Sequence, residues 1–248
     1  WECDYDPYEQ VRVRLNQYYS LGHIPSKVEL IIMGGTFPAM PLDYQEWFVT
    51  MCLEAMNRYP NGKPDGWVYL RDAQARNEHS KIRCVGMTFE TRPDWGREVH
   101  ADRMLHLGGT RVELGVQTVF DDILIRVRRG HTVKDTIEST RILKDCGFKI
   151  CYHIMPGLPG SDLDMDLKVF ETVFSDSNFM PDMLKIYPTV VVKGTGLYDD
   201  WVKDIIKAEK DEHPLYIVSI GVPKEIYRVS EDEIARYIDS KRRERGLI

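Results

Sequence analysis

Apolar residues gather in five short runs along the chain, and most of these residues are β-branched or aromatic. Each run is almost continuously apolar, whereas a strand exposed to water on one face would alternate apolar and polar residues. The pattern therefore predicts five parallel β-strands buried on both faces, over residues 28–33, 82–89, 111–116, 148–154 and 183–187.

Helical segments with recognisable ends separate the five runs. Asp6 and Pro7 place an N-cap residue directly before a proline at the first helical position. Two further pairs have the spacing of capping boxes, namely Asp43 with Glu46 and Thr132 with Asp135. Glycines follow the predicted helix ends at Gly22, Gly108, Gly109 and Gly147.

Strands that alternate with helices are typical of βα units around a parallel sheet. Five strands are too few to close an eight-stranded barrel, so the sequence predicts either a partial parallel (β/α) barrel or an open doubly wound sheet. The pattern changes after Trp201, where charged residues dominate and a charged helix is predicted over residues 231–245. We therefore divide the chain into an α/β domain over residues 1–200 and a C-terminal helical or mixed segment over residues 201–248.

The composition is that of an ordinary globular protein, with 43% hydrophobic and 29% charged residues among 248. No apolar run approaches the roughly 20 residues that cross a membrane, and the first residues do not form a signal peptide. We therefore expect a cytoplasmic protein with no membrane partner. The net charge of −6 gives no global basic surface for nucleic acid, so a nucleic-acid partner requires a local basic patch.

The five cysteines are scattered along the chain and form no CxxC pair. An odd number without such spacing argues against a disulfide framework. Cys84 and Cys151 fall in predicted strands, where a thiol behaves as a small apolar group. The sequence predicts no metal site formed by this chain alone.

Glycines and polar residues follow the predicted strands at the end where parallel strands present ligands. Gly34-Gly35-Thr36 directly follows the first strand, and glycine there lets a carboxylate or phosphate reach the backbone amides. A tight strand-to-helix turn without a ligand explains the same residues. Glu90 and Arg92 end the second strand two positions apart, which suits a zwitterionic ligand such as an amino acid, or a pair between the two.

The third strand carries two polar residues, Glu113 and Gln117, whose spacing turns them to the same face. A buried carboxylate needs a partner, so Glu113 either belongs to a site or forms an ion pair with an arginine. Gln117, at the strand end, is placed to bond a hydroxyl or an amide. The following loop suits a carboxylate or phosphate, or forms a solvated face, through Arg126, Arg128, Arg129 and His131.

The last two predicted strands also end in polar residues. His153 precedes a stiff segment of prolines and glycines, although a single histidine at such a position is often a core residue. Lys185 and Tyr187 point to one face of the fifth strand. A lysine inside a barrel is costly unless it is paired, which favours a functional role for Lys185.

Taken together, the motifs resemble those of radical S-adenosylmethionine enzymes. More narrowly, their order resembles the catalytic subunit of Elongator, a family of tRNA uridine-34 acetyltransferases, in its archaeal or bacterial form. The motifs are Gly34-Gly35-Thr36-Phe37, Glu90-Thr91-Arg92-Pro93, Glu113-x-Gly115-x-Gln117, Arg129-Gly130-His131-Thr132, Met155-Pro156 with Leu158-Pro159, and Leu184-Lys185 with Tyr187-Pro188. The resemblance spans about residues 5–201 and implies a partial barrel of the radical S-adenosylmethionine type.

The resemblance implies an enzyme that forms the carboxymethyl group at carbon 5 of the wobble uridine of tRNA. Its implied cofactors are S-adenosylmethionine, a 4Fe-4S cluster and acetyl-CoA. The implied S-adenosylmethionine site consists of Gly34, Gly35, Thr36, Glu113, Gln117, Arg129 and His153. The implied catalytic residues near the reaction centre are Lys185 and Tyr187.

We expect tRNA contacts from the cationic loop, at Arg126, Arg128 and His131, since cations that neutralise phosphates dominate nucleic-acid affinity. A basic tail over residues 241–245 is a second candidate. The expected partners are tRNA and other Elongator-type subunits or a second copy of the chain.

Two features of the family do not occur in this sequence. The cluster-binding spacing CxxxCxxC is absent from its 248 residues, and no acetyltransferase domain follows the predicted barrel. We therefore expect a fragment of a longer enzyme that is inactive by itself. Two alternatives remain, a radical enzyme acting on a small molecule, such as the porphyrinogen-oxidising group, and a non-catalytic binding or assembly module.

Overall fold

The computed structural model describes residues 3–194, 196–200 and 202–203. The chain divides into two compact units, Trp1–Pro156 with Gly160–Tyr187 and Gly157–Pro159 with Pro188–Ile248. The predicted helix over residues 231–245 and the basic tail lie outside the described residues, and the division at residue 200 stays a prediction. The strands, their helices and the candidate site lie in the first unit.

All five predicted strands form, and they pair into one parallel sheet in the order β1-β2-β3-β4-β5. Their ends agree with the apolar runs to within two residues. The largest difference is at β2, which ends at Thr91, two residues past the predicted end, and so brings Glu90 into the sheet. The strands are β1 Lys27–Ile32, β2 Arg83–Thr91, β3 Arg111–Gln117, β4 Lys149–Ile154 and β5 Met183–Ile186.

Helices occupy the connections between the strands. The α-helices are α1 Pro7–Ser20, α2 Leu42–Arg58, α3 Leu70–Asn77, α4 Glu98–His106, α5 Asp121–Arg126, α6 Val133–Asp145 and α7 Leu163–Ser175. Short 3-10 turns, η1 Phe37–Ala39 and η2 Pro93–Trp95, follow β1 and β2. No helix among the described residues is long and apolar enough to span a bilayer.

Two of the three predicted helix starts are confirmed. Asp6 is the N-cap of α1, where its carboxylate accepts a hydrogen bond from the Glu9 amide. Thr132 and Asp135 form a reciprocal capping box at the start of α6.

The capping box predicted for Asp43 and Glu46 is wrong. Pro41 is the N-cap residue of α2, so Asp43 already lies in the first helical turn, where its carboxylate accepts from the Tyr44 amide. Glu46 instead pairs with Arg103 of α4. The spacing was correct for a box, but the proline before it moved the start of the helix.

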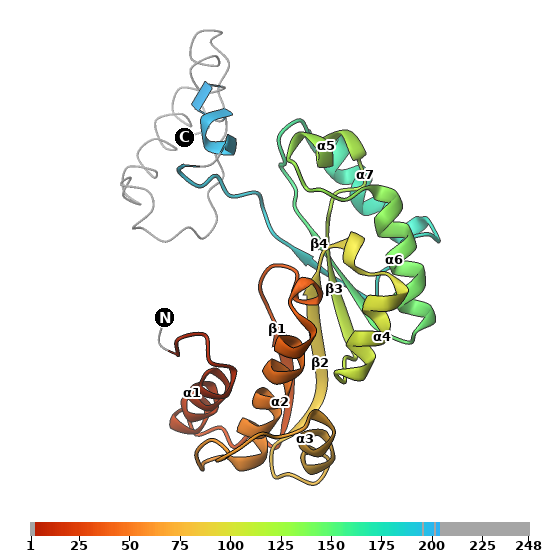
Figure 1. Ribbon diagram of the computed structural model, residues 1–248. Coiled ribbons are helices and arrows are strands. Elements are labelled where there is room, and N and C mark those ends of the chain that lie inside the picture. The colour runs from red at the N-terminus through yellow and green to blue at the C-terminus, as the bar shows by residue number, and fades with distance from the viewer. Residues whose placement is uncertain (1–2, 195, 201, 204–248) are drawn as a thin grey trace. The chain divides into compact units, whose positions relative to one another are not determined.

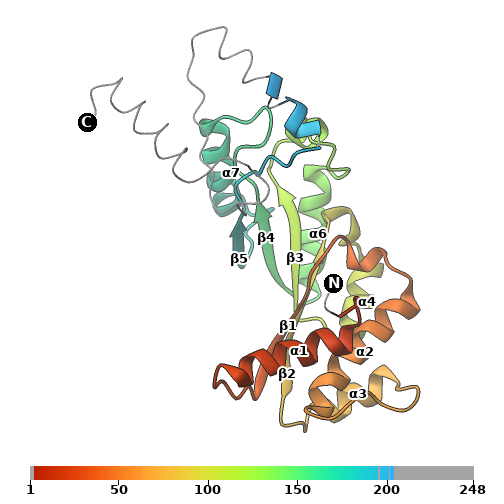
Figure 2. The same cartoon turned by 90° about the vertical axis from the view of Figure 1, so that its left-hand side faces the viewer.

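The sequential strand order identifies the fold as a partial barrel and excludes a doubly wound sheet. Right-handed crossovers between successive neighbouring strands place every helix on the same face, whereas a doubly wound sheet reverses its order midway and carries helices on both faces. Figure 1 shows α4 and α6 to the right of β2 to β4 and α2 beside β1, and Figure 2 shows the strands from a perpendicular direction. The sheet is a curled half-barrel whose other, concave face is not covered by these helices.

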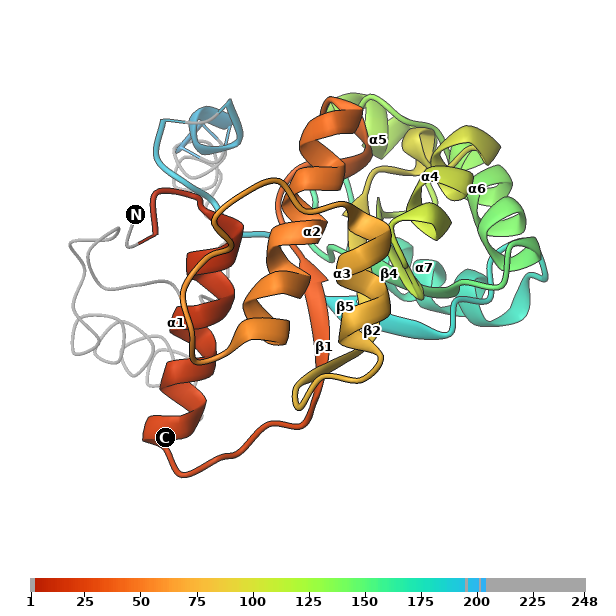
Figure 3. The ribbon, with the colours of Figure 1, turned by 60° about the horizontal axis from the view of Figure 1, so that its bottom comes forward.

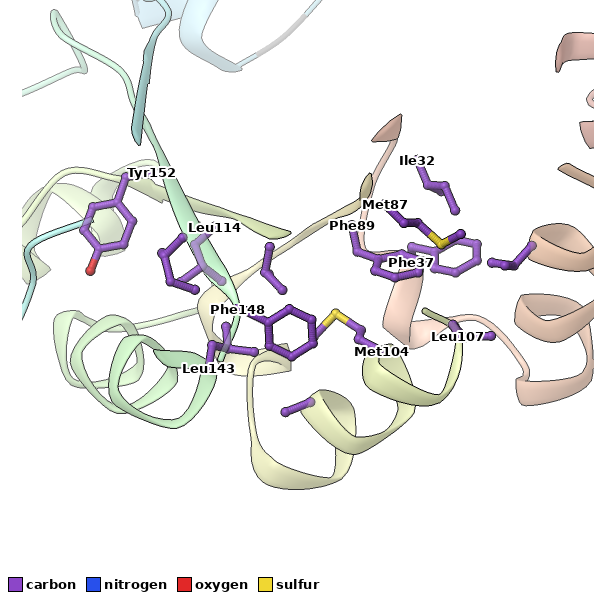
Figure 4. Close-up of a cluster of buried hydrophobic side chains, with 14 of the residues drawn as sticks. Ile32, Phe37, Met87, Phe89, Met104, Leu107, Leu114, Leu143, Phe148 and Tyr152 are labelled. Atoms are coloured by element: carbon purple, nitrogen blue, oxygen red, sulfur yellow. The ribbon is translucent and has the colours of Figure 1, made fainter. Parts of the chain in front are cut away.

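The hydrophobic core fills the space between the sheet and the helices. Phe37 of η1 stacks on Phe89 of β2 with ring centroids 5.4 Å apart. Phe148 and Leu143 approach Met104 of α4 in the same cluster (Figure 4). Burying such side chains contributes about 1.5–3 kcal/mol each. This burial determines which face of each strand packs against the helices.

At the N-terminal edge, α1 packs on α2 and α2 packs on α3. Figure 3 shows these three helices side by side next to β1. Glu54 of α2 is buried and pairs with Arg76 of α3 at 2.8 Å. The layer is joined to the sheet through α2, which packs on β2.

Candidate ligand-binding face of the sheet

Alternation along the strands places polar side chains on the concave face. In β3, Val112 and Leu114 belong to the core, so Glu113 and Gly115 point the opposite way. Strand register sets Glu113 beside Glu90 of β2 and Cys151 of β4. The concave-face residues of β2 to β5 and of the position just after β5 are Glu90, Arg111, Glu113, Gly115, Gln117, Cys151, His153, Lys185 and Tyr187.

Glu113 lies at the centre of this face and binds side chains from two other strands. It is 1% exposed. Its Oε2 accepts a hydrogen bond from Lys185 Nζ of β5 at 2.5 Å and lies 2.8 Å from His153 Nε2 of β4. Its Oε1 lies 3.6 Å from Arg111 Nε, and neither of these two atoms has a hydrogen-bond partner. The sequence alternative of an ion pair with an arginine is therefore partly realised, but lysine and histidine are the nearer partners.

Glu113 and Lys185 each stabilise the charged form of the other. Burial raises the pKa of Glu113, but the hydrogen bonds from Lys185 and His153 outweigh it and bring that pKa below its ordinary value. Burial lowers the pKa of Lys185, and the hydrogen bond to Glu113 overrides that effect, so the net pKa of the amine is raised. Both groups are therefore charged at neutral pH, as a buried ion pair requires.

Two more side chains border this ion pair. Tyr187 packs edge-on against His153 with ring centroids 5.2 Å apart, so Lys185, Tyr187 and His153 lie together as predicted candidates for one site. Cys151 is buried, and burial together with Glu113 raises the pKa of its thiol to about 11. The thiol is therefore protonated at neutral pH.

The glycine turn after β1 forms the rim next to β2. Gly34 and Gly35 have φ values of +112° and +62°, which L side chains rarely adopt, and nothing lies within 4 Å of a Cβ built on either. The Gly34 amide donates to Glu90 Oε2 at 3.1 Å. Thr36 follows as the partly buried residue before η1. The turn thus presents its backbone to open space, as a ligand site requires.

Gln117 ends β3 in a strained conformation. Its φ is +69°, although it is not glycine, and its side chain is 7% exposed with Oε1 unpartnered. The neighbouring Thr118 Oγ1 is also buried without a partner. Strain and unpaired buried polar atoms concentrate at functional sites, so this strand end is a strong ligand candidate.

Arg129 returns from the loop to the same strand end. Its Nη2 donates to the Gly115 carbonyl at 3.2 Å, and a Cβ at position 115 would lie 2.7 Å from that nitrogen and 3.2 Å from Gln117 Nε2. Glycine at 115 therefore lets the two side chains meet. Arg129 Nε is buried without a partner, and no salt bridge to this arginine occurs within the described part of the chain. Burial and the nearby Arg92 lower the pKa of Arg129. A bound anion would stabilise the charged guanidinium in this position.

The remaining loop residues separate into two groups. Arg126 and Arg128 are exposed, and Arg128 has a φ of +55°. His131 is only 5% exposed, and its Nε2 lies 3.3 Å from the Val116 carbonyl. Burial, followed by Arg129, lowers the pKa of His131, so the ring is neutral at pH 7. Its predicted contact with tRNA stays a prediction.

The structure thus brings the predicted residues into two neighbouring groups. One group is the ion-pair cluster around Glu113, with Lys185, His153 and Tyr187. The other is the strand-end group of Gln117 and Arg129, while the glycine turn lies across the rim beside Glu90. Sequence reasoning gave no role to Arg111, although its position two residues before Glu113 on the same face was a usable signal.

The cysteines do not gather. Cys52 lies in α2, Cys84 in β2, Cys146 after α6 and Cys151 in β4, all as free thiols. Among the described residues, the one group of three metal-ligating side chains is Glu113, Cys151 and His153, whose ligand atoms lie within 4.8 Å of one another.

Comparison with known proteins gives a consistent family match. The model of the Radical SAM superfamily matches residues 10–173. A tRNA uridine(34) acetyltransferase of Methanocaldococcus infernus is 48% identical over 216 residues, which are 87% of this chain and 39% of that protein. The human Elongator complex protein 3 is 40% identical over 233 residues, which are 92% of this chain and 42% of that protein.

A solved structure agrees with the sequence comparisons. The archaeal Methanocaldococcus infernus Elp3 with an N-terminal deletion has a TM-score of 0.79 and 41% sequence identity, and the match covers 99% of this chain and 60% of that one. The chain therefore spans about two fifths of the length of the curated relatives it matches.

Proposed function

The chain belongs to the radical SAM superfamily, and from that premise we propose that it is the S-adenosylmethionine-binding core of a tRNA-modifying enzyme acting on uridine 34. The observation that carries the proposal is the similarity over 87% of this chain to a tRNA uridine(34) acetyltransferase. We place the enzyme in the cytoplasm, with tRNA and either Elongator-type subunits or a second copy of the chain as partners.

The strand-end residues fit S-adenosylmethionine. Gln117 Oε1 and Arg129 Nε are buried polar atoms without partners, and no atom lies within 4 Å of a Cβ built on Gly34 or Gly35, so a ligand can approach the backbone of the turn. The cofactor carries an amino group, a carboxylate and ribose hydroxyls that suit such groups. We assign its binding to Gly34, Gly35, Thr36, Glu113, Gln117, Arg129 and His153. When bound beside a reduced cluster, S-adenosylmethionine supplies a 5′-deoxyadenosyl radical.

The described residues do not fit a 4Fe-4S cluster. Such clusters are held by thiolates, and the described cysteines lie on separate elements with no three together. The family implies the cluster, but no step through it is derived from the residues of this chain. Acetyl-CoA enters the proposal only through the name of the relatives.

We assign separate roles toward the substrate to the residues near His153 and to the exposed arginines. Lys185 and Tyr187 lie together beside His153 and are assigned to the reacting end of the substrate. Arg126 and Arg128 are exposed and are assigned to tRNA phosphates, with His131 shaping the same loop. Cations of this kind position a nucleic acid without reading its sequence.

Calorimetric titration with S-adenosylmethionine tests the proposal. The chain should bind the cofactor saturably at one site, and Gln117→Ala should weaken binding about tenfold, since a lost buried hydrogen bond costs roughly 1–3 kcal/mol. Gln10→Ala, at an exposed position of α1, is the matched control and should leave the affinity unchanged. No saturable binding by folded chain, or equal loss in both variants, contradicts the proposal.

A further inference from the structure

We propose that Glu113 is a positioning residue that fixes His153 with its proton on Nε2 and the Lys185 amine as an ammonium beside it. His153 Nδ1 is thereby left as the proton-accepting atom of the concave face. The ligand group it would meet is a hydrogen-bond donor such as a hydroxyl, an amide or an ammonium. The inference rests on the proposed function only in taking the concave face as the ligand face.

The chemistry of the carboxylate determines the direction of the hydrogen bond between Glu113 and His153. Lys185 and His153 both reach the same oxygen, Oε2, at 2.5 Å and 2.8 Å. A carboxylate only accepts hydrogen bonds, so the ring nitrogen that faces it must carry the hydrogen. In a neutral imidazole the other nitrogen, Nδ1, is then the acceptor.

Glu113 itself stays ionised. Two cations face it, Lys185 at Oε2 and Arg111 with its Nε 3.6 Å from Oε1. The other titratable groups near the pair are the Cys151 thiol, the Tyr187 phenol and, on the neighbouring strand β2, the Glu90 carboxylate. A buried carboxylate flanked by two cations remains negative and fixes its donors.

Neighbouring side chains also restrict the orientation of the His153 ring. Tyr187 meets His153 edge-on at an interplanar angle of 64°, and the His153 side chain is only 14% exposed. The ring contact with Tyr187 and the hydrogen bond to Glu113 together restrict rotation of the imidazole. A carboxylate that orients a histidine is a general way to set which nitrogen reacts.

A metal ion would compete with this arrangement, because Glu113, Cys151 and His153 together offer three donor atoms. The Lys185 ammonium already lies against the carboxylate oxygen, and Arg111 adds a second positive charge nearby. Two adjacent cations repel a divalent ion, and the Cys151 thiol would have to lose its proton to bind one. We therefore assign the position of the cation to lysine.

Nitrogen-15 NMR of histidine-labelled chain, without S-adenosylmethionine or tRNA, tests the inference. In the wild type, His153 should show a proton on Nε2. Glu113→Leu removes the oxygen that accepts from both Lys185 and His153, so the His153 proton should no longer be fixed on Nε2 and the signals should show both neutral forms of the ring. Glu90→Gln, the neighbouring acid of the same face, is the matched control and should leave the His153 signals unchanged.

Further outcomes keep the inference falsifiable even where Glu113→Leu does not fold. A wild-type His153 with its proton on Nδ1, or with protons on both ring nitrogens, would overturn it, as would a switch of the protonated nitrogen in Lys185→Met. A shift of the wild-type His153 signals on adding Zn²⁺ would show that a metal takes the place of the lysine and would also overturn it. Because the NMR experiment contains no cofactor, a result that contradicts the role of Glu113 says nothing about S-adenosylmethionine binding, and the two can be told apart.

Discussion

Glu90 Oε2 accepts a hydrogen bond from the Gly34 amide at 3.1 Å, and this contact ties the end of β2 to the glycine turn after β1. The two residues are 56 positions apart in the sequence. Gly34 has a φ of +112°, so the bond holds a backbone shape that few residues adopt. The rim of the concave face is therefore shaped before any ligand arrives.

Removing this carboxylate should loosen the rim. We expect Glu90→Ala to lower the free energy of unfolding by about 1 kcal/mol, the usual net worth of a partly exposed hydrogen bond. Urea denaturation measures the change. Glu78→Ala, at an exposed site after α3, is the control, and equal midpoints for the two variants would refute the assigned role of Glu90.

A substitution in the glycine turn should cost stability through the backbone alone. Gly35 has a φ of +62° and nothing within 4 Å of an added Cβ. Gly35→Ala should therefore destabilise the chain by about 1 kcal/mol, the cost of a left-handed conformation for an L residue. Gly62→Ala, where an added Cβ also meets nothing and no positive φ occurs, should be neutral or slightly stabilising in the same denaturation experiment.

The ion pair at Glu113 should appear in the acid limb of the stability curve. Burial raises the pKa of Glu113, but the hydrogen bonds from Lys185 and His153 outweigh burial, so the folded pKa lies below the ordinary value of 4.5. The unfolded chain therefore takes up the proton first. The contribution of Glu113 is complete above about pH 4.5 and is lost as pH falls through the folded pKa.

Comparison of wild type with Glu113→Gln isolates this contribution. The variant should lose about 3 kcal/mol at pH 7, because it leaves Lys185 without its carboxylate in a partly buried site. The difference between the two proteins should shrink as the pH falls from 5 to 3. Urea midpoints at each pH measure it, and a difference that is constant with pH would contradict the lowered pKa.

The exposed arginines of the α5–α6 loop should contribute to the salt dependence of tRNA binding. Each phosphate contact adds roughly one unit to the slope of log affinity against log salt. Replacing Arg126 and Arg128 by glutamine should therefore flatten that slope by up to about two units in fluorescence titrations. Arg83→Gln, exposed at the opposite end of β2, should leave it unchanged; equal effects would reject the loop as the tRNA contact.

Local signals in the sequence were sufficient for the strands and for most helix ends. The apolar runs located β1 to β5. Burial on both faces is confirmed for most of β3 and β4 but is wrong for β1 and β5, whose residues are mostly exposed or half-buried. The capping box at Thr132 and Asp135 was predictable because its partners are three residues apart. The box at Asp43 failed because Pro41 competed for the same helix start.

Tertiary structure alone decided which polar residues share a site. The sequence determined that Glu113 is a buried carboxylate in need of a partner, but its partners, Lys185 and His153, are 72 and 40 residues away. The sequential parallel order and the register of five strands brought them to one oxygen. Hydrophobic burial sets the face of each strand locally, whereas hydrogen bonds between strands set the register, and only the register determines which charges meet.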